Sequence, residues 1–150
     1  MKIEVADAAA MESLGAQLAQ SRAAGIIYLK GDLGAGKTTL ARGFLQALGH
    51  TGRVRSPTYT LIEPYPFDFG MVYHIDLYRL SDAGEVEDLG LRDLLEEQAL
   101  LLVEWPERGS GVLPAADLLI SIEHLDVGRR VTLEAATAAG QHLVSKLQPA

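Results

Sequence analysis

The sequence contains no cysteine and no asparagine. The absence of cysteine excludes disulfide bonds and any metal site built on thiolates. No apolar run approaches the roughly 20 residues of a transmembrane helix. The segment Met1–Asp7 carries acids where a signal peptide has an apolar core. We therefore expect a cytoplasmic protein that makes no contact with a membrane.

Basic residues are also scarce, because 13 Lys and Arg oppose 20 Asp and Glu and give a formal net charge of −7. Proteins that bind nucleic acid over a broad surface need an excess of positive charge. Direct, strong binding of tRNA or DNA by this chain alone is therefore not expected, although it could act on nucleic acid through a partner. At 150 residues without internal repeats, the chain is expected to form one domain, residues 1–150.

The most specific motif is GDLGAGKT at residues 31–38, which fits the phosphate-binding loop (P-loop) pattern G-x-x-x-x-G-K-[ST]. The preceding segment, Gly25–Lys30, is short, apolar and rich in β-branched residues, which predicts a buried strand. Residues 38–49 have helical periodicity and end on a glycine. Strand, glycine loop and helix together form the context that this motif requires. The helix is predicted to bury one face, made of Leu40, Phe44, Ala47 and Leu48.

The residue types in this loop suit the binding of a nucleoside triphosphate with Mg²⁺. Glycines let successive backbone N–H groups point at one phosphate, and the helix N-terminus adds positive potential. Lys37 would reach the β- and γ-phosphates, and the Thr38 hydroxyl would ligate Mg²⁺. The candidate nucleotide-binding residues of the loop are Gly31, Asp32, Leu33, Gly34, Ala35, Gly36, Lys37, Thr38 and Thr39.

Two acids are candidates for a second metal contact. Asp76 lies near the end of the apolar segment 71–78, and Glu104 follows the continuous apolar run 99–103. Open α/β sheets bind ligands at the carboxyl ends of their strands, and Glu104 is favoured because its strand is the more apolar. Trp105 either covers the nucleotide or packs beside the site. His74 shares a strand face with Asp76, and we interpret it as structural rather than as a ligand.

The segment 50–60 is a candidate switch loop, because Pro57 interrupts regular structure among small hydroxyl residues. Loops in this position of several P-loop proteins supply a threonine to Mg²⁺ and the γ-phosphate. Thr58 is the first candidate for that catalytic role and Ser56 the second. An ordinary Ser/Thr turn is an equally good interpretation.

The whole pattern predicts an α/β fold: a P-loop NTPase domain with a central mixed sheet, a parallel core, flanking helices and an antiparallel hairpin. We expect that hairpin to pair residues 59–65 with 71–78, and to place Pro64, Pro66, Asp68 and Gly70 in the connection. The other expected elements are an edge strand at 3–5, helices at 8–22 and 138–147, and a second hairpin of residues 117–123 and 129–135. Arg129 and Arg130, beside that second turn, could reach phosphate or base, but exposed arginines at turns usually have no such specific role.

Four motifs occur in order: GDLGAGKTT at 31–39, SPTYTL at 56–61, YHIDLYR at 73–79 and LVEWPE at 102–107. Together they resemble the bacterial TsaE (YjeE) family, small ATPases of threonylcarbamoyladenosine (t6A) tRNA modification. The resemblance implies a cytoplasmic protein that binds ATP and Mg²⁺ and hydrolyses ATP weakly by itself. It also implies association with the TsaB–TsaD pair, in which TsaD modifies adenosine 37 of tRNA, so that tRNA is reached only indirectly.

Carried over by motif, the resemblance gives Lys37 and Thr38 contacts with phosphate and Mg²⁺ and places Thr58 in a switch-like loop. Asp76 and Glu104 become the acidic site residues, with Trp105 as the adjacent family tryptophan. A small-molecule kinase is the alternative, but segment 81–95 is acidic and makes a poor substrate lid. A GTP-dependent switch would need an N-K-x-D motif, which a chain without asparagine lacks. A nucleotide-dependent binding module without turnover also remains open.

Overall fold

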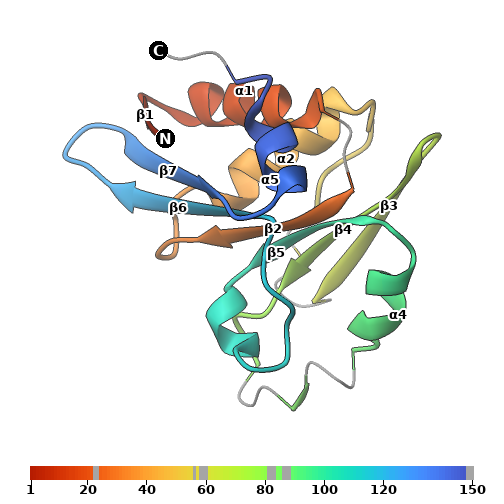
Figure 1. The fold of residues 1–150 in the computed structure, drawn as a ribbon. Helices are drawn as coiled ribbons and strands as arrows, with labels where there is room; N and C mark the ends of the chain where they lie inside the picture. The colour runs from red at the N-terminus through yellow and green to blue at the C-terminus, as the bar shows by residue number, and fades with distance from the viewer. Residues whose placement is uncertain (22–23, 56, 58–60, 81–83, 86–88, 148–150) are drawn as a thin grey trace.

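The computed structural model describes residues 1–21, 24–55, 57, 61–80, 84–85 and 89–147, and helices cover both faces of one sheet (Figure 1). The strands are β1 (Lys2–Val5), β2 (Gly25–Lys30), β3 (Ile62–Phe67), β4 (Gly70–Asp76), β5 (Leu100–Glu104), β6 (Leu118–His124) and β7 (Arg129–Ala135). The helices are α1 (Ala8–Ala19), α2 (Lys37–Ala47), α4 (Leu91–Glu96), α5 (Ala138–Val144) and the short 3₁₀ helix η1 (Pro106–Gly109).

The sheet has seven strands in the order β1-β7-β6-β2-β5-β4-β3. Strands β6, β2, β5 and β4 are parallel, whereas β3 pairs antiparallel with β4, and β7 and β1 continue antiparallel beyond β6. The predicted fold class, a mixed sheet with a parallel core, is therefore confirmed. The P-loop strand β2 lies in the middle, so the carboxyl ends of β2, β4 and β5 meet at one edge of the sheet.

Helices α1 and α2 pack side by side over one face of the sheet (Figure 1). Two glycines permit their close approach. A Cβ atom on Gly15 would lie 2.1 Å from the carbonyl oxygen of Leu40, and one on Gly43 would lie 2.1 Å from the carbonyl oxygen of Glu12. This contact fixes α2, and with it the P-loop that leads into α2, against the rest of the domain.

The central strands bury side chains on both faces, as parallel strands do. On β4 and β5 the odd-numbered residues, Tyr73 and Ile75 among them, belong to a core cluster with Leu91 of α4. The even-numbered residues face α1 and α2, because Val72 and Leu102 belong to the other core cluster. By this alternation His74, Asp76 and Glu104 all lie on the face that carries the P-loop helix.

Several predicted boundaries were wrong. Pro64 and Pro66 lie inside β3 instead of in the connection, which is Asp68–Phe69. An edge strand tolerates prolines because their missing N–H groups face no neighbouring strand. In α2, Ala47 is exposed and the buried stripe is Leu40, Ala41, Phe44 and Leu45. Ala47 lies two residues, about 200° of helical rotation, from Leu45, and so points away from the core.

Both outer helices are shorter than predicted, since α1 ends at Ala19 and α5 at Val144. Asp7 is the N-cap of α1, because its carboxylate accepts a hydrogen bond of 2.9 Å from the backbone N–H of Ala10. The edge strand β1 and the hairpin of β6 and β7 also form as predicted. Among the described residues, no helix is long and apolar enough to cross a membrane.

Candidate functional site

The P-loop connects β2 to α2 in the way that a phosphate-binding loop requires. A tight turn is closed by the backbone N–H of Ala35 donating to Asp32 at 3.1 Å, and Gly36 then serves as the N-cap with φ of 117°. That left-handed conformation is costly for residues with a side chain, which explains the glycine. No described side chain caps α2, and its first turn carries no acid. The N–H groups of this turn therefore form an anion site.

Lys37 begins α2 and turns its ammonium group back over the loop. The residue is 5% exposed, and its Nζ donates to the carbonyl oxygen of Gly31 at 2.5 Å. The same Nζ lies 3.7 Å from the ring centroid of Trp105, a cation–π contact. Burial lowers the pKa of Lys37, while the nearby carboxylates, Glu104 foremost, oppose that shift. The Trp105 ring thus packs against the site and forms one wall around the lysine.

A chain of polar contacts joins α2 to β5 and β4. The Thr38 hydroxyl donates to the Glu104 carboxylate, with Oγ1 3.0 Å from Oε2 and 3.3 Å from Oε1. The same oxygen, Oε2, also lies 2.5 Å from Nε2 of His74. Glu104 is 3% exposed and His74 is completely buried. Of the two predicted acids, Glu104 is thus the one that contacts the P-loop threonine.

Asp76 lies beside this chain, because it is the register partner of Glu104 on the adjacent parallel strand. It is 4% exposed, and its Oδ1 accepts a hydrogen bond of 2.9 Å from the backbone N–H of Tyr78. Burial raises the pKa of Asp76 and the charge of Glu104 raises it further, whereas the Tyr78 hydrogen bond lowers it. A carboxylate with a raised pKa beside a phosphate site is suited to accept a proton or to orient water.

These residues surround a cleft of about 370 Å³ that opens over the loop. It brings together nearly all the predicted site residues that the structure describes. The cleft is lined by Leu33, Gly34, Ala35, Gly36, Lys37, Thr38, Thr39, Asp76, Tyr78, Arg79, Glu104 and Trp105. A second cleft of about 310 Å³ shares Gly34–Gly36 and Thr39 with the first and extends toward Asp7, Met11 and Arg129.

Sequence reasoning missed Arg129, which was expected to have no specific role. Its guanidinium donates to the carbonyl oxygens of Ala35, at 3.2 Å, and Gly34, at 3.4 Å, and so holds the P-loop from the β6–β7 hairpin. The contact joins residues more than 90 positions apart, so no local pattern could have indicated it. The one available signal was the positive charge of Arg129, which suits a residue near a phosphate-binding loop.

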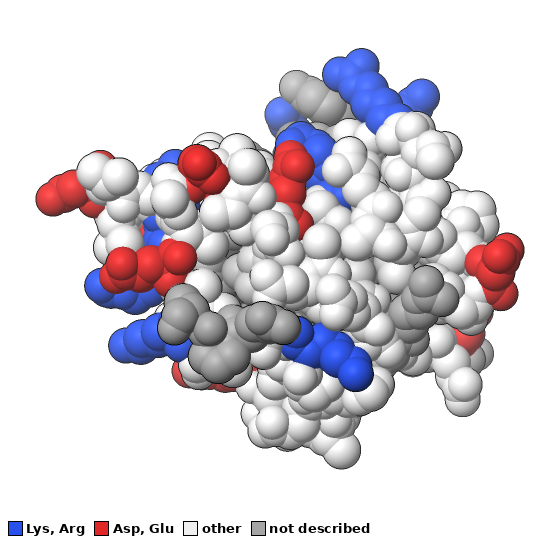
Figure 2. All heavy atoms as spheres, turned by 90° about the horizontal axis from the view of Figure 1, so that it is seen from above, with Lys and Arg blue, Asp and Glu red and all other residues white. Residues whose placement is uncertain are grey.

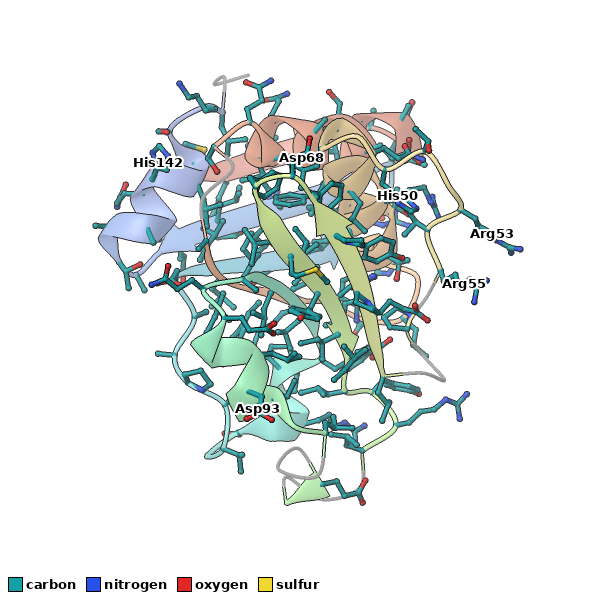
Figure 3. The ribbon with its side chains drawn as sticks, turned by 90° about the vertical axis from the view of Figure 1, so that its right-hand side faces the viewer. His50, Arg53, Arg55, Asp68, Asp93 and His142 are labelled. Carbon is teal, nitrogen blue, oxygen red and sulfur yellow. The ribbon has the colours of Figure 1, made fainter. Side chains whose placement is uncertain are left out.

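The predicted switch residue Thr58 and its alternative Ser56 lie outside the described residues. Arg42, Arg55 and Arg79 are the candidates for an arginine that reaches the γ-phosphate, and of these three only Arg79 lines the cleft. Arg42 pairs with Glu12 at 3.3 Å on the surface of α1 and α2. Arg55 projects from the segment after α2 toward solvent, as does Arg53 (Figure 3).

The chain is similar to known proteins of one family. The profile of the family described as "Threonylcarbamoyl adenosine biosynthesis protein TsaE" matches residues 5–132. Two curated relatives carry the name "tRNA threonylcarbamoyladenosine biosynthesis protein TsaE". The one from Haemophilus influenzae is 51% identical over 120 residues, which are 80% of this chain and 76% of that protein. The one from Bacillus subtilis is 43% identical over 111 residues, 73% of this chain and 69% of that protein.

The crystal structure of YdiB from Bacillus subtilis shares the fold. It matches with a TM-score of 0.78 at 32% sequence identity, and the match covers 97% of this chain and 91% of that one. The whole sheet and its helices, and not the P-loop region alone, therefore have a counterpart in a solved structure.

Proposed function

Because the chain belongs to the TsaE family, we propose that it is a Mg²⁺-dependent ATP-binding and ATP-hydrolysing protein of t6A tRNA modification. The names of its relatives place them in that biosynthesis. The proposal adds a nucleotide, a metal and a turnover reaction, each argued from this chain's own residues. In this proposal, residues 1–150 form a single ATPase domain.

The observation that carries the proposal is the contact between Thr38 and Glu104 at the start of α2. Their oxygens lie 3.0 Å apart. Two neighbouring oxygen ligands of an octahedral Mg²⁺, with bonds of about 2.0–2.1 Å, lie roughly 2.9 Å apart. A hydroxyl and a carboxylate are also the hard oxygen donors that this ion prefers. The residues present therefore fit a magnesium ion, which Thr38 and Glu104 would hold together with phosphate oxygens.

The rest of the cleft suits phosphoryl chemistry. When bound, Mg²⁺ would neutralise charge on the β- and γ-phosphates. The N–H groups of Gly34–Thr38 would bind phosphate oxygens, and the Lys37 ammonium would move from the Gly31 carbonyl to the terminal phosphates. Asp76, a buried carboxylate beside Glu104, is placed to orient the attacking water. Catalysis of this kind rests on positioning and on charge stabilisation.

The proposed base site is the second cleft, because it continues from the P-loop away from Asp76 and Glu104. It shares Gly34–Gly36 and Thr39 with the first cleft, and Met11 offers an apolar wall. Asp7, the N-cap of α1, and Arg129 supply polar groups at its rim. A nucleotide lying along the loop would thus have its phosphates near Lys37 and its base near α1.

We expect slow turnover by the isolated chain, as the motif resemblance implies, and the arginines bear on its cause. Efficient ATPases and GTPases place an arginine against the transferred phosphate, in cis or from a partner. Here Arg42 is paired with Glu12 and Arg55 points to solvent, which leaves Arg79 alone among these candidates in the cleft. We propose that the TsaB–TsaD pair, the partner implied by the motif resemblance, completes the site or controls its cycle.

Contact with tRNA is proposed to be indirect. The net charge is −7, and on the face that Figure 2 shows, basic and acidic side chains are interspersed around a largely uncharged centre. The described residues of that face therefore form no broad basic patch of the kind that binds a phosphate backbone.

The experiment is to measure phosphate release from ATP and from GTP, with and without Mg²⁺, for the protein alone and with purified TsaB–TsaD. We expect slow, Mg²⁺-dependent and ATP-selective release that rises when the partners are added. A Glu104→Gln variant should lose the activity, and Glu123→Gln, a change of the same chemistry at the exposed end of β6, should keep it. Negligible release by the wild type in every condition would reject the ATPase and favour a binding module.

A further inference from the structure

The buried ring of His74 has no part in the function proposed above, yet its contacts differ from those of an ordinary core histidine. The residue is 0% exposed, and Nε2 lies 2.5 Å from Oε2 of Glu104. The other ring nitrogen, Nδ1, is buried and has no hydrogen-bond partner among the described residues. All the polar contact of the ring is therefore directed at one carboxylate.

The unpartnered nitrogen indicates which nitrogen carries the proton. An ionised carboxylate only accepts hydrogen bonds, so Nε2 must be the donor toward Glu104. A neutral ring then leaves Nδ1 as a bare acceptor, which is less costly to bury alone than an unpartnered N–H. The contacts are therefore those of a ring whose Nε2–H is committed to Glu104.

We propose that His74 is a positioning residue that holds the Glu104 carboxylate against Thr38 and thereby strengthens Mg²⁺-dependent nucleotide binding. The inference rests on the proposed function, because it concerns the same magnesium site. The His74 ring does not contact the metal in this proposal. It affects Mg²⁺ only through the orientation of the Glu104 carboxylate.

The strand geometry explains why a second contact is needed and why His74 provides it. Glu104 ends β5, and its three side-chain torsions would let the carboxylate turn away from the Thr38 hydroxyl. His74 lies in the interior of β4, two residues before Asp76, which is the register partner of Glu104. Its ring, fixed by two torsions and complete burial, is a rigid anchor for the more flexible acid. Hydrogen-bond partners of metal ligands typically change metal affinity or activity by about 10- to 100-fold.

The first test separates the hydrogen bond from packing. His74→Leu removes the donor, and His74→Gln places an amide N–H near the position of Nε2. Calorimetry would give the affinity for ADP with and without Mg²⁺, alongside kcat and KM for ATP. For His74→Leu we expect the gain in affinity that Mg²⁺ confers to fall by about 10- to 100-fold, with Mg²⁺-free ADP binding unchanged. His74→Gln should recover most of that gain.

Tyr73→Phe is the matched control on the same strand. Tyr73 faces the opposite core, where its hydroxyl donates to Glu97 at 2.8 Å, so its loss should leave Mg²⁺-dependent affinity unchanged. An unchanged gain in His74→Leu, or an equal loss in His74→Leu and His74→Gln, would overturn the positioning role. The proposed function would survive that result, because it is rejected only by negligible phosphate release from the wild type itself.

A second readout needs neither nucleotide nor metal. The ¹⁵N shifts of the imidazole of the nucleotide-free protein report the tautomer, and the His74 variants assign the signal. We expect His74 to carry its proton on Nε2, and Glu104→Gln to shift the Nε2 resonance. A proton on Nδ1 alone in the wild type would overturn the proposal even if the His74→Leu variant failed to fold.

Discussion

Asp76 and Glu104 are register partners at the carboxyl ends of β4 and β5, but only Glu104 has the P-loop hydroxyl of Thr38 at 3.0 Å. The two carboxylates lie on one face of the sheet and line one cleft, so their different contacts imply different roles in the site. We propose that Glu104 is the acid on the metal side of the site, and that Asp76 faces the side where water would attack.

The first prediction is that Asp76→Ala and Glu104→Ala each abolish ATP turnover, by different routes. Loss of Glu104 removes a Mg²⁺ contact, so Mg²⁺-dependent nucleotide affinity should fall together with kcat. Loss of Asp76 should leave that affinity nearly intact and lower kcat by about 10²- to 10⁴-fold, as for other groups that position or accept a proton. Calorimetry and phosphate release on both variants check this. Wild-type turnover in either variant would contradict the assignment.

A second prediction concerns Lys37, whose ammonium is buried between the Gly31 carbonyl and the Trp105 ring. Lys37→Ala should weaken nucleotide binding by roughly 1.5–3 kcal/mol, the contribution of a hydrogen bond to a charged group, in addition to abolishing turnover. Titration with a fluorescent ADP analogue measures the affinity. Lys2→Ala, a loss of the same charge on the edge strand β1, is the control and should bind normally. Equal affinity for Lys37→Ala and the wild type would show that the lysine does not reach phosphate.

The third prediction is that the buried carboxylate of Asp76 destabilises the nucleotide-free protein. Burial raises the pKa of Asp76 above its value in the unfolded chain. The folded state therefore retains this proton to higher pH, and its stability falls as the pH rises from the ordinary aspartate pKa of about 4 through the raised one. Asp76→Asn removes this penalty while its amide oxygen still accepts from Tyr78. We expect the nucleotide-free variant to gain stability over the wild type between pH 4 and pH 7.

Urea unfolding at the two pH values measures that difference. Asp68→Asn, at the exposed turn of the β3–β4 hairpin (Figure 3), is the control for a surface carboxylate. A gap between Asp76→Asn and the wild type that is constant or narrows toward pH 7 would contradict the raised pKa.

Local sequence patterns were sufficient to predict the secondary-structure elements that carry the site. The P-loop with its strand and helix, the two acids at strand ends and the β6–β7 hairpin follow from periodicity and from residues with fixed backbone roles. Long-range contacts could not be read in this way. The Arg129 contact with the P-loop and the His74 contact with Glu104 join segments far apart in the chain. Pro64 was misplaced for a related reason, because only the sheet order reveals that β3 is an edge strand.

The glycine contacts between α1 and α2 allow a prediction about stability alone. A methyl group on Gly43 would lie 2.1 Å from the carbonyl oxygen of Glu12, a backbone atom that cannot move aside. Gly43→Ala should therefore push the helices apart and destabilise the protein by about 1–3 kcal/mol or more, as overpacked cores do. Gly52→Ala is the control, since a Cβ there would meet only the His50 ring at 3.4 Å. Thermal unfolding of both variants compares them, and equal midpoints would contradict the close packing.

Arg129 and Arg130 are neighbours on β7 with different surroundings, which makes them a natural pair for the last prediction. Arg129 donates to the Ala35 and Gly34 carbonyls of the P-loop, whereas Arg130 reaches Glu4 at 3.5 Å and Glu123 at 3.7 Å on the surface. Arg129→Ala should weaken ADP binding by about 1 kcal/mol or more, because the loop loses two hydrogen bonds that hold its shape. Arg130→Ala should leave ADP binding unchanged, since exposed ion pairs contribute little. If the two variants bound ADP equally well, the loop would keep its shape without Arg129, and the charge near the phosphates would have no role.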